Sequence, residues 1–233
     1  MLELRQLDAA IGNVTILRNV GFMLAEGDTV ALIGRNGAGK TTLLRSIMGF
    51  TDVTGSIRFA GQEMTSLAPA HRPGLGIGYA PEDRRLFSAF TVEENLKLPV
   101  QVAGLGAAEQ AQRLERVYHI LPELREMAAR PAGNVSGGQG KMVALGRALM
   151  LGTRLIMLDE PFQGLAPALA RRYAEALRTL RDTDQNVALF ITESNPALLR
   201  SLADRTLVIE RGEVTENLLE PEGQGSDRAD STR

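Results

Sequence analysis

Continuous apolar runs, rather than alternating ones, form the strongest hydrophobic pattern along the chain. They lie at Thr29 to Gly34 (TVALIG), Thr153 to Pro161 (TRLIMLDEP), Asn186 to Thr192 (NVALFIT) and Arg205 to Gly212 (RTLVIERG). Strands that are covered on both faces, as in parallel sheets flanked by helices, have runs of this kind. The pattern therefore predicts a mostly parallel sheet in an α/β fold.

Two further patterns predict the elements around this sheet. Lys40 to Met48 and Pro167 to Arg181 are predicted helices, and the second carries its apolar side chains at helical spacing. Near the N-terminus, the segments LELRQLDAAIG, VTILRNVGFML and TGSIRFAG are punctuated by glycine and predict antiparallel strands. We therefore expect an N-terminal antiparallel β subdomain beside the parallel sheet.

The pattern becomes helical between residues 87 and 151. TVEENLKLPVQVAGL, AAEQAQRLERVYHILPEL and the stretch after SGGQ predict helices, and Thr91 with Glu94 fits a capping box. We expect an α-helical subdomain at about 87–151, inserted into an α/β core of about 1–86 and 152–216. Residues 217–233 are polar and rich in glycine and acidic side chains, which predicts a disordered tail.

The amino-acid composition limits the partners and the kinds of site that this protein can have. The chain has 233 residues, of which 44% are hydrophobic and 23% charged, as expected for a globular protein with a real core. A net charge of -2 gives no basic footprint for nucleic acid. The absence of cysteine excludes disulfides, zinc-thiolate sites and cysteine nucleophiles. Because no signal peptide or long apolar run is visible, we expect a soluble cytoplasmic protein.

A glycine-rich stretch joins the first predicted strand to the first predicted helix. GRNGAGKT, Gly34 to Thr41, fits the G-x-x-x-x-G-K-[ST] pattern of a phosphate-binding loop. Its glycines allow successive N–H groups to point at phosphate oxygens, and the helix adds its positive end. Lys40 is predicted to reach the β and γ phosphates, and Thr41 to bind magnesium. The alternative, a chance glycine turn with a lysine, fits the strand–loop–helix context poorly. The predicted nucleotide contacts in this stretch are Gly34, Arg35, Asn36, Gly37, Ala38, Gly39, Lys40, Thr41 and Thr42.

Two acids end the apolar run LIMLDEP. Asp159 is predicted to orient magnesium through its water shell, and Glu160 to polarise the attacking water as general base. An acid pair at a strand end is often only a turn, but the phosphate-binding loop upstream favours the functional interpretation.

A second glycine-rich turn, SGGQ at Ser136 to Gln139, also precedes a predicted helix. It has no lysine and follows no predicted strand, so it is not a second complete phosphate site. Its serine hydroxyl, its glycine N–H groups and the positive end of the helix could still contact a γ-phosphate that is held elsewhere. The alternative is a serine N-cap beside a glycine turn.

The order of these motifs resembles that of the ATP-binding cassette (ABC) ATPases, over roughly Met1 to Glu216. The resemblance implies a P-loop NTPase core, ATP and Mg²⁺ as ligands, and two cassettes that meet head to tail with ATP between them. The residues Ser136, Gly137, Gly138 and Gln139 would then face the nucleotide of the partner chain, giving two sites under two-fold symmetry. The partner would be a second copy or a paralogous ABC ATPase subunit.

Three stretches resemble one branch of that family, the smaller ATP-binding subunit of branched-chain amino acid importers and relatives that import amides or urea. They are GIGYAPEDRRLFSAFTVEENLKL, QGLAPALARR and ESNPALLRSLADRTLVIERGEV. The resemblance implies a peripheral ATPase on the cytoplasmic face of the inner (plasma) membrane, with permease partners, indirectly a substrate-binding protein, and no nucleic acid. Glu82 would stand where most cassettes have a glutamine that touches magnesium; a polar turn is the alternative.

Four positions depart from the family pattern. Ile11 stands where an aromatic usually stacks on adenine, and it offers apolar contact without a π face. Phe162 replaces a common serine, and Gly140 replaces a residue that is often polar and bulky. Ser194 stands where a histidine, or in the importer branch a glutamine, holds the γ-phosphate, so this contact is expected to need a water. We hypothesise that the isolated subunit turns over slowly and depends on its partners.

Two other functions stay open. A soluble ABC ATPase of translation or DNA repair would carry tandem cassettes, long coiled-coil inserts or basic extensions, which this sequence does not show. A binding-only regulatory cassette would be recognised by equal phosphate release from the wild type and Glu160→Gln.

Overall fold

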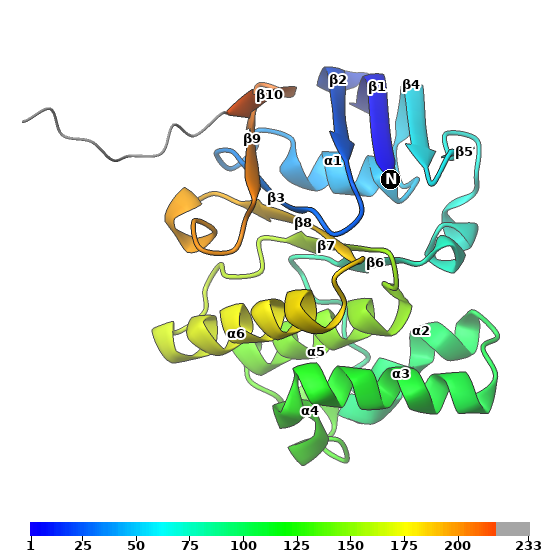
Figure 1. The fold of residues 1–233 in the computed structure, drawn as a ribbon, viewed down its shortest axis with the longest axis vertical. Helices are drawn as coiled ribbons and strands as arrows, with labels where there is room; N and C mark the ends of the chain where they lie inside the picture. Colours follow the sequence, from blue (N-terminus) through cyan, green and yellow to red (C-terminus); the bar gives the residue numbers. More distant parts are fainter. Residues whose placement is uncertain (218–233) are drawn as a thin grey trace, which may run out of the picture.

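Two sheets and a block of helices form residues 1–217, the part of the chain that the computed structural model describes (Figure 1). A four-stranded antiparallel sheet has the order β2-β1-β4-β5, and a six-stranded sheet has the order β10-β9-β3-β8-β7-β6. Helix α1 lies between the two sheets, helices α5 and α6 lie along the opposite face of the larger sheet, and α2, α3 and α4 lie beyond them. This is the predicted α/β architecture with an antiparallel subdomain and an inserted helical subdomain.

The antiparallel sheet contains the three strands predicted near the N-terminus. They are β1 (Leu2–Ile11), β2 (Val14–Leu24) and β4 (Asp52–Phe59), and the short β5 (Gln62–Glu63) extends the sheet. Strand β1 pairs antiparallel with both β2 and β4. The prediction of antiparallel strands is confirmed.

The four apolar runs form four neighbouring parallel strands of the larger sheet. They are β3 (Thr29–Ile33), β7 (Leu155–Asp159), β8 (Ala188–Glu193) and β9 (Arg205–Glu210). Successive residues of β8 alternate between two cores, with Phe190 facing α1 and Ile191 facing the helical block. Both faces are buried, which explains why these strands read as continuous apolar runs.

Two strands of this sheet were not predicted. Strand β6 (Ile77–Ala80) pairs parallel with β7, and β10 (Glu213–Asn217) pairs antiparallel with β9 at the edge. Strand β6 is short and contains Gly78, where an added Cβ would lie 2.1 Å from the carbonyl oxygen of Ala148. Glycine therefore permits close packing on α5 but weakens the strand pattern in the sequence. Strand β10 includes the first residue of the predicted tail, and residues 218–233 lie outside the described part.

The helices follow the predicted pattern. They are α1 (Lys40–Ile47), α2 (Val92–Val102), α3 (Ala107–Ile120), α4 (Pro122–Glu126), α5 (Gly137–Leu151) and α6 (Pro167–Thr183), with 3₁₀ turns at Pro69–His71, Pro73–Leu75, Ala132–Asn134 and Pro196–Leu198. The Thr91–Glu94 capping box is present at the start of α2. Among the described residues, we find no helix that is both long and apolar enough to cross a bilayer.

Candidate functional site

The predicted phosphate-binding loop connects β3 to α1. Gly37 and Gly39 have φ angles of 82° and 113°, a backbone region that residues with a Cβ rarely adopt. Gly39 is also the N-cap of α1, and no side chain caps the helix there. The positive end of α1 and its first N–H groups therefore remain available for an anion.

A cleft of about 490 Å³ opens over this loop. Its lining residues are Ile16, Asn36, Gly37, Gly39, Lys40, Thr41, Thr42, Glu82, Glu160 and Gln163. The loop residues Gly34, Arg35 and Ala38 do not line the cleft. Ile11 is 53% exposed at the end of β1 and does not line it either, whereas Ile16 of β2 does.

The Lys40 ammonium is buried among oxygen atoms at the base of this cleft. Its Nζ donates hydrogen bonds to the carbonyl oxygens of Gly34, at 2.5 Å, and Arg35, at 3.1 Å. It also donates to Ser194 Oγ, at 3.1 Å, and forms an ion pair with Glu160 Oε1, at 2.9 Å. Both side chains of this ion pair are almost fully buried. Lysine and glutamate thus neutralise each other where phosphate is expected.

The Ser194 hydroxyl joins the loop to the acidic pair. Its Oγ lies 2.7 Å from Asn36 Oδ1 and 2.7 Å from Glu160 Oε1. One hydroxyl carries one proton, so it donates to one of these oxygens at a time while it accepts from Lys40. The structure therefore brings Ser194 and the predicted base together in one hydrogen-bonded cluster.

Glu160 is ionised in this cluster. Burial raises its pKa, but the hydrogen bonds from Ser194 and Lys40 and the lysine charge outweigh burial and leave the pKa below its ordinary value. The backbone of Glu160 has a φ of 47°, which is uncommon for a residue with a Cβ. Its N–H donates to the carbonyl oxygen of Thr192, at 3.2 Å, and to Thr192 Oγ1, at 3.1 Å.

Asp159 is buried beside this cluster at the carboxyl end of β7. Its Oδ1 accepts a hydrogen bond from Thr192 Oγ1, at 2.8 Å, and its Oδ2 accepts one from the Tyr79 hydroxyl, at 3.4 Å. Burial raises the pKa of Asp159, and burial together with the Asp159 charge raises that of Tyr79. The tyrosine therefore remains a hydrogen-bond donor.

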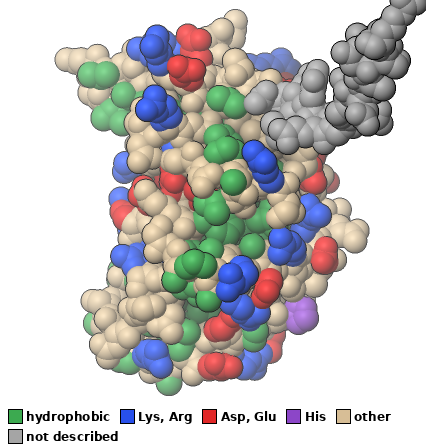
Figure 2. All heavy atoms as spheres, turned by 90° about the vertical axis from the view of Figure 1, so that its left-hand side faces the viewer, with side chains coloured by type: hydrophobic (Ala, Val, Ile, Leu, Met, Phe, Trp, Pro, Cys, Tyr) green, Lys and Arg blue, Asp and Glu red, His purple; other side chains and the backbone are tan. Residues whose placement is uncertain are grey.

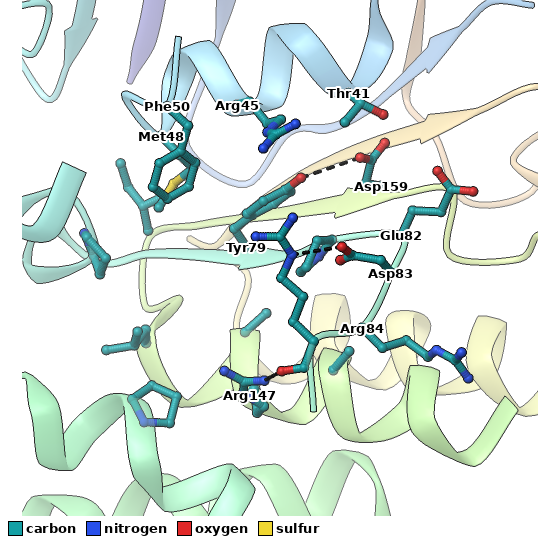
Figure 3. Close-up of a pocket in the computed structure, with 18 residues that line it drawn as sticks. Thr41, Arg45, Met48, Phe50, Tyr79, Glu82, Asp83, Arg84, Arg147 and Asp159 are labelled. Atoms are coloured by element: carbon teal, nitrogen blue, oxygen red, sulfur yellow. Dashed lines mark hydrogen bonds and ion pairs between the residues drawn. The ribbon is translucent and has the colours of Figure 1, made fainter. Parts of the chain in front are cut away.

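The three predicted magnesium ligands line one larger cavity of about 600 Å³ (Figure 3). Thr41, Asp159 and Glu82 all face it, and all three offer oxygen atoms, the donors that Mg²⁺ takes. No group of three or more His, Cys, Asp or Glu side chains is placed to hold a metal within residues 1–217. Two carboxylates and a hydroxyl fit an ion that takes its remaining oxygens from water and phosphate.

Ser136 of the SGGQ motif is the N-cap of helix α5, as predicted by the alternative interpretation of this turn. Gln139 N–H donates to Ser136 Oγ, at 3.2 Å, and Ser136 N–H donates to Gln139 Oε1, at 2.9 Å, which completes a capping box. Gly137 and Gly138 line a separate hollow of about 320 Å³. None of the SGGQ residues lines the cleft over the phosphate-binding loop.

The sequence did not point to five residues around this site: Ile16, Tyr79, Lys141, Thr192 and Glu193. Strand register could have found two of them, because Asp159 pairs with Thr192 and Ile33 pairs with Glu193 across neighbouring parallel strands. The carboxyl ends of parallel strands meet at one edge of a sheet. The other three gave no signal in the sequence.

The phosphate-binding loop follows β3, and a buried aspartate and an ionised glutamate stand at the carboxyl end of β7, one strand away across β8. This combination defines the class of P-loop nucleotide hydrolases. Within this class, residues 17–163 match the family model described as "ABC transporter". The chain belongs to the ABC transporter family, and it is an ATPase.

Two relatives match nearly the whole chain. "High-affinity branched-chain amino acid transport ATP-binding protein BraG" of Pseudomonas aeruginosa is 36% identical, covering 92% of this chain and 91% of that protein. "Probable branched-chain amino acid transport ATP-binding protein LivF" of Archaeoglobus fulgidus is 34% identical, covering 93% and 91%. Further relatives are named for the import of Fe(3+) ions or of sulfate and thiosulfate.

The fold is also similar to that of a solved ABC transporter cassette. The crystal structure of an ATP-binding cassette in its ADP conformation has a TM-score of 0.76 and is 28% identical, with 92% of this chain and 89% of that chain covered. The prediction of an ABC ATPase fold is thereby confirmed.

Proposed function

We propose that this chain is the ATP-hydrolysing subunit of an importer for branched-chain amino acids or a related small polar solute. The likeness to the two branched-chain relatives supports the substrate class. The observation that carries hydrolysis is the buried ion pair of Lys40 and Glu160 at the phosphate-binding loop, with the hydroxyl of the exposed Ser194 bonded to both.

Nucleotide binding would rearrange this cluster. A γ-phosphate in the cleft offers Lys40 an anionic partner in place of Glu160, whose carboxylate lies 2.9 Å from Nζ. Glu160 is then free to orient and polarise the attacking water as general base. Ser194, freed from the lysine, would contact the γ-phosphate directly or through a water. Thr41, Asp159 and Glu82 would hold Mg²⁺, which neutralises phosphate charge in phosphoryl transfer.

The signature turn would serve a partner chain. The Ser136 hydroxyl accepts from Gln139, so its own proton is free for donation to a phosphate brought by another cassette. Figure 2 shows hydrophobic side chains along the middle of the face that lies on the left in Figure 1, with charged side chains around them. Such a face fits a second cassette, either a copy of this chain or a paralogue.

The cavity in Figure 3 is the proposed contact for a permease. It is lined by Phe50 from the core, which is 54% exposed, and by Pro99 and Arg147 from the helical block. Thr41 and Asp159 line the same cavity, so a permease segment bound there would lie beside the magnesium ligands. This arrangement would place the chain against the cytoplasmic face of the membrane, with a substrate-binding protein involved only indirectly.

The proposed function predicts phosphate release that depends on Glu160. We expect the wild type to release phosphate from ATP and Glu160→Gln, which keeps the shape but loses the base, to be slower by about 100-fold or more. Equal rates would favour a binding-only cassette. Co-purification with a hydrophobic membrane subunit, rather than co-sedimentation with ribosomes, would support transport over translation.

A further inference from the structure

Lys141 connects the signature helix to the catalytic loop. It lies on the first turn of α5, one turn after Gly137, and lines the hollow beside the two signature glycines. Its Nζ donates a hydrogen bond of 2.6 Å to the backbone carbonyl oxygen of Glu160. The Lys141 side chain thus joins helix α5, which begins with the SGGQ motif, to Glu160, the proposed base.

Glu193 holds the same loop from the core side. It is the last residue of β8 and is 2% exposed. Its Oε1 accepts a hydrogen bond of 2.8 Å from the N–H of Phe162. The loop is therefore fixed at the Glu160 carbonyl by the Lys141 ammonium on the helical block, and two residues later by the Glu193 carboxyl group on the sheet.

The backbone of Glu160 depends on these contacts. Its left-handed conformation is unfavourable for a residue with a Cβ and persists where the surroundings fix it. Besides Lys141, its carbonyl oxygen accepts only a 3.3 Å bond from the Gln163 N–H among the described hydrogen bonds. Loss of the lysine would leave the carbonyl with this longer bond alone. The backbone that sets the direction of the Glu160 side chain would then be held less firmly, which matters most once a phosphate has taken Lys40 from the carboxylate.

The two charges also support each other. Burial lowers the pKa of Lys141, and the charges of Glu193, Glu82 and Glu160 raise it again. Burial raises the pKa of Glu193 to about 7, while the Phe162 N–H and the Lys141 charge oppose that rise. Each ion is thus more stable with the other present.

We propose that Lys141 and Glu193 are positioning residues for ATP hydrolysis, which act together to hold the loop from Glu160 to Gln163 and transmit movement of helix α5 to the catalytic carboxylate. This inference rests on the proposed role of Glu160 as the base. Neither Lys141 nor Glu193 lines the cleft over the phosphate-binding loop. We therefore expect both residues to affect turnover and not nucleotide affinity.

The interaction between Lys141 and Glu193 can be measured without ATP hydrolysis. The chain contains three lysines, Lys40, Lys97 and Lys141, so ¹³C-lysine labelling gives three side-chain signals that single substitutions assign. We expect the Lys141 signal to titrate below the ordinary lysine pKa, and Glu193→Gln to lower that pKa further. An unchanged Lys141 titration in Glu193→Gln would overturn the pairing, whatever the enzyme does.

Kinetics of the full chain then test the positioning role. We expect Lys141→Met to lower kcat by roughly 10- to 100-fold with KM changed less than about twofold, and Lys141→Arg to restore most of kcat. Adding Glu193→Gln to Lys141→Met should lower kcat no further, because the two act as a unit. Lys97→Met, which removes a lysine from a half-buried ion pair with Glu93 on α2, away from the loop, is the matched control.

Wild-type kcat in Lys141→Met, or an equal loss in Lys141→Arg, would overturn the inference. The inference would also be overturned if the fold-losses of kcat in Lys141→Met and Glu193→Gln multiplied in the double variant. These outcomes differ from failure of the proposed function itself, which would appear as equal phosphate release by the wild type and Glu160→Gln. The lysine titration remains decisive if Lys141→Met does not fold.

Discussion

Lys40 and Glu160 form a buried ion pair, and the hydroxyl of the exposed Ser194 bonds to both of them. The lysine is held by two backbone carbonyls, a hydroxyl and a carboxylate. A buried ion pair is weak support for stability, because desolvation opposes the attraction between its charges. We therefore interpret the pair as a resting arrangement from which a phosphate can take the lysine.

Ser194 is expected to affect turnover more than affinity. Ser194→Ala removes the hydroxyl that touches both Asn36 and Glu160 but leaves the Lys40–Glu160 ion pair in place. We predict that kcat falls by about tenfold while the Kd for ATP changes less than about twofold. Steady-state hydrolysis and fluorescent nucleotide titration measure the two. Ser201→Ala, at an exposed hydroxyl bonded to Arg178, is the control and should change neither.

The Glu193 carboxyl gives stability a pH dependence. Its pKa is raised to about 7 by burial, and the groups that face it are Glu160, Lys141 and Tyr173. An unfolded glutamate titrates near 4.3, so between these pH values the folded chain binds a proton that the unfolded chain does not. This contribution is fully present below about pH 4 and is lost as the pH rises to about 7.

We predict that the free energy of unfolding of the wild type falls relative to Glu193→Gln between about pH 5 and pH 8. Urea unfolding of both proteins at the two pH values measures the difference. A difference that is equal at both would contradict the assigned shift.

At the scale of elements, Arg72 joins three segments of the core. It is 2% exposed, and its guanidinium donates to the carbonyl oxygens of Ser46 and Ile47 at the end of α1 and of Met64 and Leu67 after β5. A cation at the carboxyl end of a helix is favourable. Among the described hydrogen bonds, Arg72 is the donor to the carbonyls of Ile47 and Leu67, whereas those of Ser46 and Met64 also accept from backbone N–H groups.

Arg72→Met should therefore destabilise the fold strongly. The carbonyls of Ile47 and Leu67 would lose their described donor and those of Ser46 and Met64 would lose one of two, so we predict a loss of about 3 kcal/mol or more in the free energy of unfolding. Arg58→Met, which removes an exposed bond to the carbonyl of Gly61, should cost about 0.5 kcal/mol or less. Urea unfolding measures both, and similar losses in the two variants would contradict the role of Arg72.

The elements also show what a sequence can predict. Strands β3, β7, β8 and β9 were predicted because both of their faces are apolar, whereas β6 was missed because Gly78 interrupts its pattern. The phosphate-binding loop and the Asp159–Glu160 pair are contiguous motifs and could be recognised.

The surrounding residues of the site are not contiguous. Thr192, Tyr79 and Lys141 reach the acidic pair only through strand register and helix packing, which the linear pattern does not encode. The predicted roles of the individual site residues, including Ile11, Glu82 and Ser194, remain predictions.

At the scale of the whole molecule, the larger sheet and the helical block supply different parts of the proposed ATPase. The sheet edge holds the phosphate-binding loop and both acids, and the helical block holds SGGQ and one wall of the cavity in Figure 3. Arg84 bridges the two parts, because its guanidinium donates to the Gly137 carbonyl at 3.0 Å. Gly140 leaves room for this arginine, since an added Cβ would lie 3.2 Å from its Cδ.

This division predicts slow turnover in the isolated subunit. The two parts complete a site only when a permease and a partner cassette bring the SGGQ turn of one chain to the phosphate-binding loop of the other. We expect steady-state hydrolysis by the purified chain to rise by about tenfold or more on assembly with its permease subunits. Brisk hydrolysis by the chain alone, unchanged by the permease, would contradict this coupling.

The measurement that tests the account most directly is the mass in solution of Glu160→Gln with Mg²⁺ and ATP. The variant should bind ATP without hydrolysing it, so closed pairs should accumulate, with twice the 25.2 kDa of one chain or as a complex with the paralogous cassette. Lys40→Ala, which should bind ATP poorly, should stay a single chain. If Glu160→Gln also remains a single chain with ATP, alone and mixed with the paralogue, the claim that two cassettes complete each site is wrong.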